Sequence, residues 1–191
     1  TCGTSLTWKL DEAGKLTISG TGYMDQYNWH DNAPWYDYRE KITSLEIEEG
    51  VMHIGSSAFY NFPNLKTVRI PDSVTSIGDS VFYNCRSLTS ITIPDCVTSI
   101  GEWMLSNCYS LTSVTIPDGV TSIGEYAFFG CNSLKEVHIS SIESWLGISF
   151  DGYYANPLNY ADNGLYMNGE PIREVTIPAG VRSIPLCAFA H

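Results

Sequence analysis

The chain has 191 residues, of which 43% are hydrophobic, and 10 basic against 21 acidic residues give it a formal net charge of −11. An acidic chain without a basic cluster repels phosphate, which excludes nucleic-acid binding and disfavours anionic membrane surfaces. No apolar run approaches the roughly 20 residues of a membrane-spanning helix, so we expect no membrane insertion within this chain.

Residues 1–41 are expected to form an N-terminal cap that begins with a β-hairpin. Leu6, Trp8 and Leu10 alternate with polar residues, as in a half-buried strand, and a turn and a returning strand follow within residues 5–19. The hairpin is predicted to cover the exposed end of the structure that follows.

The remainder of this cap, residues 23–41, is rich in Tyr and Trp. Asn32 and Pro34 favour the start of a short helix there. Packing against the first repeat is the preferred interpretation, because aromatic residues fill cores more often than they bind ligands. Under the alternative, a binding site, the candidate ligand-binding residues are Trp29, Trp35 and Tyr36.

The rest of the chain, residues 42–191, is dominated by a repeat whose period is 23. Copies begin at Ile42, Leu65, Leu88, Leu111 and Leu134. A last copy begins only at Ile172, later than the period requires, so the fifth repeat contains an insertion that lengthens it by 15. One copy cannot bury its apolar side chains, and stacked copies turn each column into a continuous ladder.

Each column of the repeat has a physical role. Val68 and Ile70 alternate with polar residues and predict a strand, which Pro71 ends because proline cannot continue a ladder. Two later columns are expected to point inward and form a structural ladder, and these are Phe59, Phe82, Leu105, Phe128 and Phe189, together with Cys85, Cys108 and Cys131. The sequence therefore predicts a mostly β solenoid with an N-terminal hairpin cap.

The cysteine column allows a metal site or a redox centre as alternatives to a structural role. Three thiols in equivalent stacked positions are better explained as small buried hydrophobic groups. Side chains of stacked, in-register segments run parallel, so we expect no disulfide among Cys85, Cys108 and Cys131, and we expect Cys96 and Cys187 to be unpaired.

The insertion, about residues 140–171, departs from the repeat. Ser141 is placed to cap a short helix that buries Trp145 and Leu146, and the dipeptide at 168–169, Asn-Gly, predicts a hairpin turn. Insertions in repeat proteins often carry binding, and packing is an equal alternative here. The candidate ligand-binding residues of this segment are Tyr153, Tyr154 and Tyr160.

Sequence signatures of catalysis and cofactor binding are missing. The four histidines are scattered without metal-ligand spacing, and no nucleophile elbow, phosphate-binding loop or dinucleotide fingerprint occurs. We therefore expect no enzyme activity, no catalytic residues, no cofactor and no metal.

The segment Leu111-Thr-Ser-Val-Thr-Ile-Pro-Asp-Gly-Val-Thr-Ser-Ile-Gly-Glu-Tyr-Ala-Phe-Phe-Gly-Cys resembles the repeat of the BspA-like, or Treponema pallidum-type, leucine-rich-repeat family. The resemblance covers residues 42–139 and 172–191, and residues 2–41 resemble the cap that precedes such repeats. It implies a leucine-rich-repeat solenoid, an extracellular, secreted or surface-attached protein of a host-associated bacterium, and adhesion to host proteins. Departures are the insertion, Trp103-Met104-Leu105 in place of the usual Ala-Phe, and Pro185 in place of glycine.

The expected function is binding or adhesion to a host or community macromolecule, preferably a protein. The alternative is a carbohydrate-binding module that uses the aromatic residues of 23–38 or 150–166. Exposed strand positions such as Thr92 and Thr115 lack the aromatic and arginine anchors of tight binding, so they favour a scaffold role. The repeat is interrupted at His191, which predicts either further repeats in the natural protein or end-to-end self-association.

Overall fold

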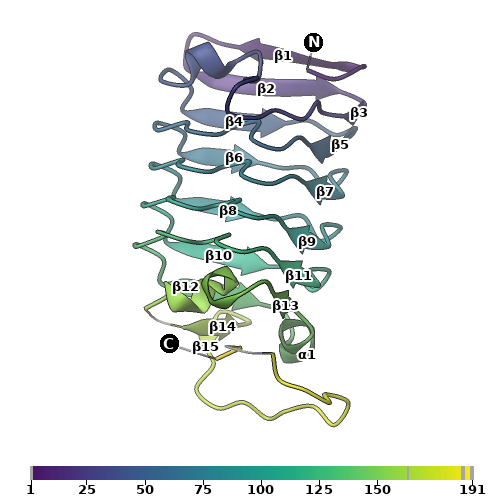
Figure 1. Cartoon of the computed structure of the whole chain (residues 1–191), viewed down its shortest axis with the longest axis vertical. Coiled ribbons are helices and arrows are strands. Elements are labelled where there is room, and N and C mark those ends of the chain that lie inside the picture. Colours follow the sequence, from purple (N-terminus) through teal and green to yellow (C-terminus); the bar gives the residue numbers. More distant parts are fainter. Residues whose placement is uncertain (1, 163, 186–187, 190–191) are drawn as a thin grey trace.

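The computed structural model describes residues 2–162, 164–185 and 188–189. The chain winds into a stack of coils with the N-terminus at one end, and each coil adds one strand to each of two faces (Figure 1). Parallel strands on both faces give the mostly β solenoid that the repeat predicts. Cys187 and His191 lie outside the described residues.

The first face contains the longer strands. Its strands are β1 (Leu6–Leu10), β2 (Lys15–Gly20), β4 (Ser44–Ile47), β6 (Thr67–Arg69), β8 (Ser90–Thr92), β10 (Ser113–Ile116), β12 (Glu136–Ile139), β14 (Leu165–Met167) and β15 (Glu170–Pro171). In the regular part of the stack, each residue pairs with its counterpart one period away, as for Ser90 with Ser113 and Ser113 with Glu136. The apolar side chains of alternate residues point inward, and the Ser and Thr side chains between them face solvent.

The second face carries short strands at the second apolar pair of each copy. Its strands are β3 (Gly22–Tyr23), β5 (Val51–Ile54), β7 (Ser76–Ile77), β9 (Ser99–Ile100), β11 (Ser122–Ile123) and β13 (Ser149–Phe150). Ile77, Ile100 and Ile123 are buried beneath it.

The third side of each coil is a turn that is also hydrogen-bonded between coils. Alternate N–H groups in residues 57–61 donate to carbonyl oxygens in residues 79–83 of the next coil, and the pattern recurs in the following coils. Two positions of every turn adopt left-handed backbone with φ between 54° and 75°, and these are Ser57, Ser80, Trp103 and Tyr126 in one column and Asn61, Asn84, Asn107 and Gly130 in the other. Asparagine and glycine tolerate this conformation best, which explains the second column.

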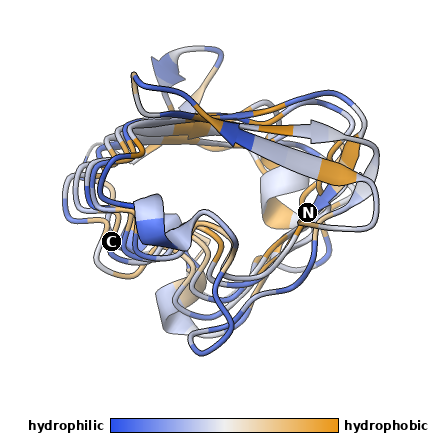
Figure 2. Cartoon of the chain, turned by 90° about the horizontal axis from the view of Figure 1, so that it is seen from above, coloured by the Kyte–Doolittle hydropathy of each residue, from blue (hydrophilic) through white to orange (hydrophobic). Residues whose placement is uncertain are grey.

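The interior is filled by the columns that the repeat predicted to point inward. Seen along the stack, hydrophobic segments line the inside of the coils (Figure 2). Phe59, Phe82, Leu105 and Phe128 are completely buried, and the rings of Phe59 and Phe82 stack with centroids 5.7 Å apart. Burying rings of this size supplies much of the hydrophobic free energy of the stack.

The cysteine column lies beside these rings. Cys85, Cys108 and Cys131 are buried and not disulfide-bonded, as predicted, and the exposed Cys96 is also free. The Cys108 Sγ–H donates to the Phe82 carbonyl oxygen at 3.3 Å, and the other two make the equivalent bond. Burial raises the pKa of the Cys85 and Cys131 thiols to about 12. These cysteines therefore act as small hydrophobic groups that also satisfy a buried carbonyl.

The repeated glycines after the second strand are required by close packing between coils. Gly124 has a φ outside the left-handed region, and a Cβ there would lie 2.6 Å from the Glu102 backbone nitrogen. A side chain would push adjacent coils apart at this corner.

The N-terminal end is closed as the sequence predicts, by the antiparallel hairpin of β1 and β2, with β2 parallel to β4. The helix expected after Asn32 and Pro34 is a single 3₁₀ turn, η1 (Tyr36–Tyr38). Trp35 next to it stacks on Phe59 at 5.3 Å and fills the end of the core.

The interpretation of residues 140–171 as an insertion needs correction, because most of these residues form a further, longer coil of the stack. β13 pairs with β11, and β14 pairs with β12 so that Val137 lies opposite Leu165, farther along the chain than one regular period. The coil also contains α1 (Ile142–Leu146), capped by the Ser141 side chain as predicted, and the 3₁₀ turns η2 (Tyr153–Ala155) and η3 (Pro157–Asn159). The Asn-Gly turn at 168–169 connects β14 to the antiparallel β15, as the dipeptide predicts.

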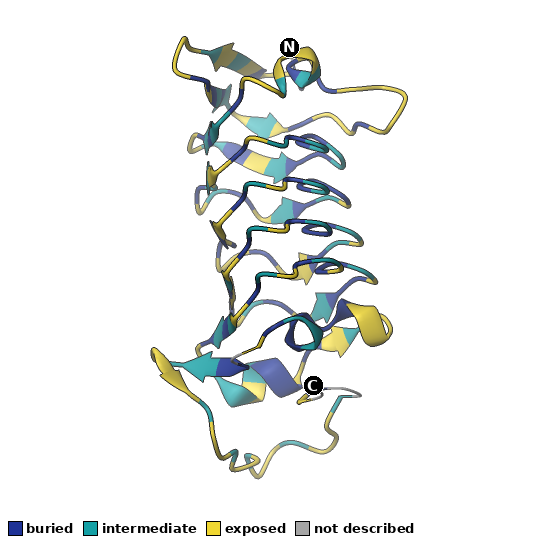
Figure 3. Ribbon diagram, turned by 90° about the vertical axis from the view of Figure 1, so that its left-hand side faces the viewer, coloured by how far each residue is buried: buried dark blue, intermediate teal, exposed yellow. Residues whose placement is uncertain are grey.

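The last copy, from Ile172, does not form the predicted strand. β15 occupies the edge of β14 where a further parallel strand would pair, so residues 173–178 have no regular structure and Ile177 is exposed. The prediction that Phe189 belongs to the buried ladder is wrong, because the side chain is 37% exposed. Figure 3 shows the contrast between the regular coils, with buried interior segments, and this largely exposed segment.

Candidate functional site

Partly exposed aromatic rings form a continuous row along the third side of the solenoid. We call this row the aromatic ribbon, and its members are Trp29, Tyr36, Tyr60, Tyr83, Trp103, Tyr126, Phe129, Tyr153 and Tyr154. Trp29, Tyr153 and Tyr154 are 60%, 52% and 42% exposed. Each coil contributes at least one ring, so the ribbon runs along the axis of the stack rather than along a strand.

Neighbouring rings of the ribbon are in contact throughout. Ring centroids are 5.4 Å apart between Tyr60 and Tyr83, 6.1 Å between Tyr83 and Trp103, and 4.3 Å between Trp103 and Tyr126. Tyr126 stacks in turn on Tyr154 at 5.2 Å. The repeating coil therefore brings residues from both ends of the chain into one surface.

Two columns of the turn supply the rings of the regular coils. Tyr60 and Tyr83 follow the buried phenylalanine directly, whereas Trp103 and Tyr126 stand two positions before the buried ladder residue of their coils. The second column is the left-handed one, where φ is 56° at Trp103 and 58° at Tyr126. A side chain with a Cβ costs about 1–2 kcal/mol in this conformation. The ribbon thus continues through positions that disfavour bulky residues.

Carboxylates border the ribbon on the side of the second face. Asp79, Glu102 and Glu125 occupy one column, directly before the left-handed position, and all three are exposed. The Glu125 carboxylate raises the pKa of the Tyr126 hydroxyl by its charge and by a hydrogen bond. The border is therefore negatively charged, and at Glu125 it contacts the ribbon through the Tyr126 hydroxyl.

The stacking limits what the ribbon can bind. Tyr126 lies nearly parallel to Trp103 on one side and to Tyr154 on the other, with interplanar angles of 18° and 14°. Both faces of the Tyr126 ring are therefore occupied, and this ring presents its edge and its hydroxyl group to solvent. Amphipathic ring edges with a polar tip are typical of protein interfaces.

Comparison with family models decides the class of the repeat. The model of the BspA type leucine rich repeat region matches residues 33–156 in 6 copies. The chain belongs to this family.

Solved structures of bacterial leucine-rich-repeat proteins resemble this BspA-type chain. A leucine-rich repeat protein from Eubacterium ventriosum is 26% identical with a TM-score of 0.60, over 73% of this chain and 43% of that one. A leucine rich cell surface protein from Faecalibacterium prausnitzii is 28% identical with a TM-score of 0.53, over 88% and 54%. The T. pallidum leucine-rich-repeat protein shares the fold at 21% identity and a TM-score of 0.52, over 80% and 81%.

The present chain thus spans about half of the E. ventriosum and F. prausnitzii proteins. A comparison with curated proteins gives no match. The family is generally non-catalytic and typically serves in binding or adhesion. Among the residues that the structure describes, no helix has the length and apolar character needed to cross a membrane.

The BspA-type structure places most, but not all, of the candidate ligand-binding residues in the ribbon. Trp29, Tyr36, Tyr153 and Tyr154 all lie in the ribbon. Naming Trp35 as a ligand-binding candidate was wrong, because it is completely buried and its Nε1–H donates to the Ala58 carbonyl oxygen.

The Tyr160 ring contacts the ribbon at Phe129. The two ring centroids are 6.4 Å apart, the Tyr160 hydroxyl is buried, and burial raises the pKa of that hydroxyl to about 12. Its position suits it to supporting Phe129.

The aromatic residues of 23–38 and 150–166 were predicted as separate candidate segments, and the rings between them were not predicted. Tyr60 and Tyr83 are one repeat period apart, and so are Trp103 and Tyr126. This spacing was a usable signal, but the aromatic position changes column between Tyr83 and Trp103, which hides the continuity of the row.

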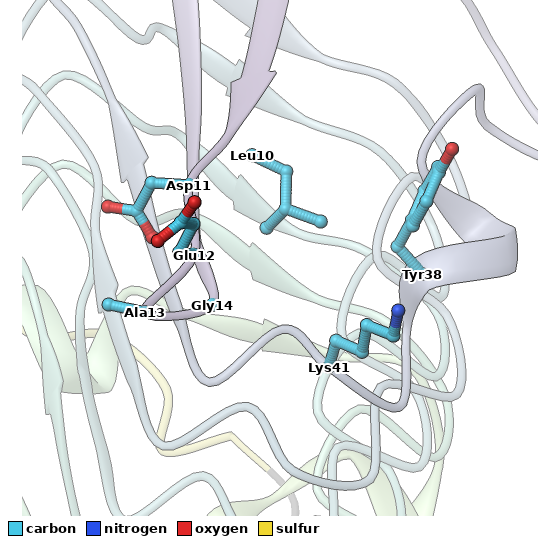
Figure 4. Close-up of a pocket in the computed structure, with 7 residues that line it drawn as sticks. All are labelled: Leu10, Asp11, Glu12, Ala13, Gly14, Tyr38 and Lys41. Atoms are coloured by element: carbon cyan, nitrogen blue, oxygen red, sulfur yellow. The ribbon is translucent and has the colours of Figure 1, made fainter.

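A separate hollow of about 590 Å³ lies at the N-terminal end of the BspA-type stack, between the β1–β2 turn and Tyr38. In Figure 4 the carboxylates of Asp11 and Glu12 lie on one side of it and Tyr38 and Lys41 on the other, and their polar groups do not converge. No group of three or more metal-ligating side chains occurs among the described residues. The aromatic ribbon is therefore the better candidate site.

Proposed function

We propose that this BspA-type repeat region is the binding module of a bacterial surface or secreted protein, and that it recognises a protein partner through the aromatic ribbon. The observation that carries the proposal is the continuity of the ribbon across the coils from Trp29 to Tyr154. Monomeric soluble proteins rarely expose large contiguous apolar patches unless those patches bind a partner.

The backbone conformation at two ribbon residues supports a role of their rings in binding. Trp103 and Tyr126 occupy left-handed positions at which the equivalent coils have Ser57 and Ser80. Both rings are only half-buried, so a large, partly exposed side chain stands at a position whose backbone costs it about 1–2 kcal/mol. A contribution to binding explains why bulky residues stand there.

Recognition of protein is favoured over recognition of carbohydrate. Sugar rings stack on open aromatic faces, and the faces of Tyr60 and Tyr126 are covered by neighbouring rings. Tyr and Trp edges with polar hydroxyl and indole N–H groups supply contact area at low entropic cost in protein interfaces. The Ser and Thr side chains of the first face, such as Thr92 and Thr115, are exposed but lack such anchors.

The test is binding to arrayed extracellular proteins and, in parallel, to arrayed glycans. The ribbon variant is Trp103→Asn with Tyr126→Asn, because asparagine accepts left-handed backbone and leaves the coil intact. The matched control is Thr92→Ala with Thr115→Ala on the first face. Thermal unfolding of all three proteins verifies that each is folded.

We expect the unmodified protein to bind one or more arrayed proteins. The ribbon variant should bind them at least about tenfold more weakly, as for interface hot spots, and the control should bind them as the unmodified protein does. Signals that only the control loses would place the site on the first face. Ribbon-dependent signals confined to glycans would replace the proposal with the carbohydrate-binding alternative.

A further inference from the structure

We infer that the partner contributes an extended basic segment containing arginine, which lies along the ribbon between its rings and its acidic border. This inference rests on the proposed function, because it names the chemistry of the partner at the same site.

The acidic border repeats with the coil and is not neutralised by the chain itself. Among the described residues, no ion pair involves Asp79, Glu102 or Glu125. One Asp79 oxygen accepts the Glu102 backbone N–H at 2.9 Å, which fixes that carboxylate against the next coil. Adjacent coils are about 4.8 Å apart, so three like charges stand in a row that a cationic partner would stabilise.

Two basic side chains of this chain are paired with a carboxylate on a different side of the coil. Lys15 and Arg69 pair with Glu46 on the first face, at 2.5 and 3.0 Å. Their charge is directed away from the turn that carries the ribbon, because strands β2 and β6 belong to a different side of the coil. The border therefore keeps its negative potential toward an approaching partner.

Arginine fits this surface better than lysine does. Its planar guanidinium binds carboxylates in bidentate fashion and rests on aromatic groups, while its alkyl stem packs on apolar ring edges. Two arginines of the chain already lie on aromatic rings in this way. The Arg39 guanidinium lies 4.4 Å from the centroid of Tyr36, and that of Arg86 lies 5.8 Å from the centroid of Tyr109.

Geometry favours an extended segment over a helix or a folded knob. The ribbon and its border are two parallel columns that follow the axis of the stack, with one acidic residue in each of three successive coils. An extended chain can present side chains alternately to the two columns along this length.

The experiment uses two synthetic peptides, one in which arginine alternates with serine and one in which citrulline replaces every arginine. Titration calorimetry compares the unmodified protein with Glu102→Gln/Glu125→Gln, which removes two charges from the border. The matched control is Asp95→Asn/Asp118→Asn, which removes two exposed charges from another corner of the same coils.

We expect the arginine peptide to bind the unmodified protein and the control alike, and to bind the border variant about tenfold more weakly, as for lost charge pairs at an interface. The citrulline peptide should not bind measurably. Raising ionic strength from about 0.05 to about 0.5 M should weaken the arginine complex, because the border is exposed.

Several outcomes would overturn the inference. These are absence of binding by the arginine peptide, equal binding by the citrulline peptide, and equal losses in the border variant and the control, which would reduce the effect to net charge. The proposed function would survive any of them if the ribbon variant still lost its arrayed protein partners, and it would fall separately if that variant kept them.

Discussion

The buried ladder and the aromatic ribbon come from the same turns of the chain, and yet they have opposite relations to solvent. Phe82 is completely buried, whereas the next residue, Tyr83, is half-buried and belongs to the ribbon. Both rings stack on rings of neighbouring coils, 5.7 Å from Phe59 and 5.4 Å from Tyr60. Ring stacking alone therefore does not separate a structural ring from a candidate binding ring, and burial does.

The two rows also differ in how strictly they follow the repeat. The inner ladder keeps one column in the regular coils, because a missing side chain would leave a cavity in every neighbour. The ribbon changes column between Tyr83 and Trp103 and still remains continuous, since an exposed row needs only adjacent rings. Substitutions in the two rows should therefore affect different properties.

The largest effect is expected from Phe82→Ala. Removing a fully buried ring should lower the free energy of unfolding by about 3–5 kcal/mol, because two packed coils cannot close around the cavity. Urea unfolding followed by tryptophan fluorescence measures the change.

Tyr83→Ala is the matched control for Phe82→Ala, and it should cost less because its ring is half-exposed. Equal losses in the two variants would mean that the ribbon is a second part of the core and would weaken its assignment as a binding surface.

A smaller effect is expected from Cys108→Ser, which lies in the buried row beside the rings. The hydroxyl can still donate to the Phe82 carbonyl, but burying a more polar group with one bond should cost about 1–2 kcal/mol. The exposed Cys96 gives the control, because Cys96→Ser should leave unfolding unchanged. A Cys108→Ser protein as stable as its parent would show that the thiol column contributes little to the core.

The regular coils were predictable from the sequence because their columns repeat. Val114, Ile116 and Phe128 recur in register with their counterparts, and the core buries all of them. The capped helix α1 and the Asn-Gly turn were predictable from local chemistry, since each depends on adjacent residues.

The remaining features of the structure could not be predicted, because they depend on contacts between residues that lie far apart in the sequence. The coil formed by residues 140–171 was hidden because Val137 pairs with Leu165, at a longer spacing than the period of the regular coils. The last copy has the strand pattern, yet the edge it needs is occupied by β15. Trp35 is buried because it fills the end of the core against Phe59. The aromatic composition of residues 23–41 does not determine which of its rings takes that place.

The smallest change in stability is expected from Trp103→Asn, a single substitution in the ribbon. The variant loses stacking on Tyr126, worth about 0.5–1.5 kcal/mol, and the burial of about half of the indole, worth about 1–2 kcal/mol. It also relieves a left-handed tryptophan, which costs about 1–2 kcal/mol at a residue of this kind. The relief offsets much of these losses, so the free energy of unfolding should fall by no more than about 1.5 kcal/mol.

Asn84 and Asn107 already occupy left-handed positions in the same turns, so the substituted residue has precedents in this fold. Trp103→Phe serves as the control, because it keeps a stacked ring and the backbone cost together. A loss of several kcal/mol in Trp103→Asn, close to that of Phe82→Ala, would show that the indole is part of the core. A stability near that of the parent, combined with lost binding to arrayed proteins, would separate the ribbon from the adjacent ladder.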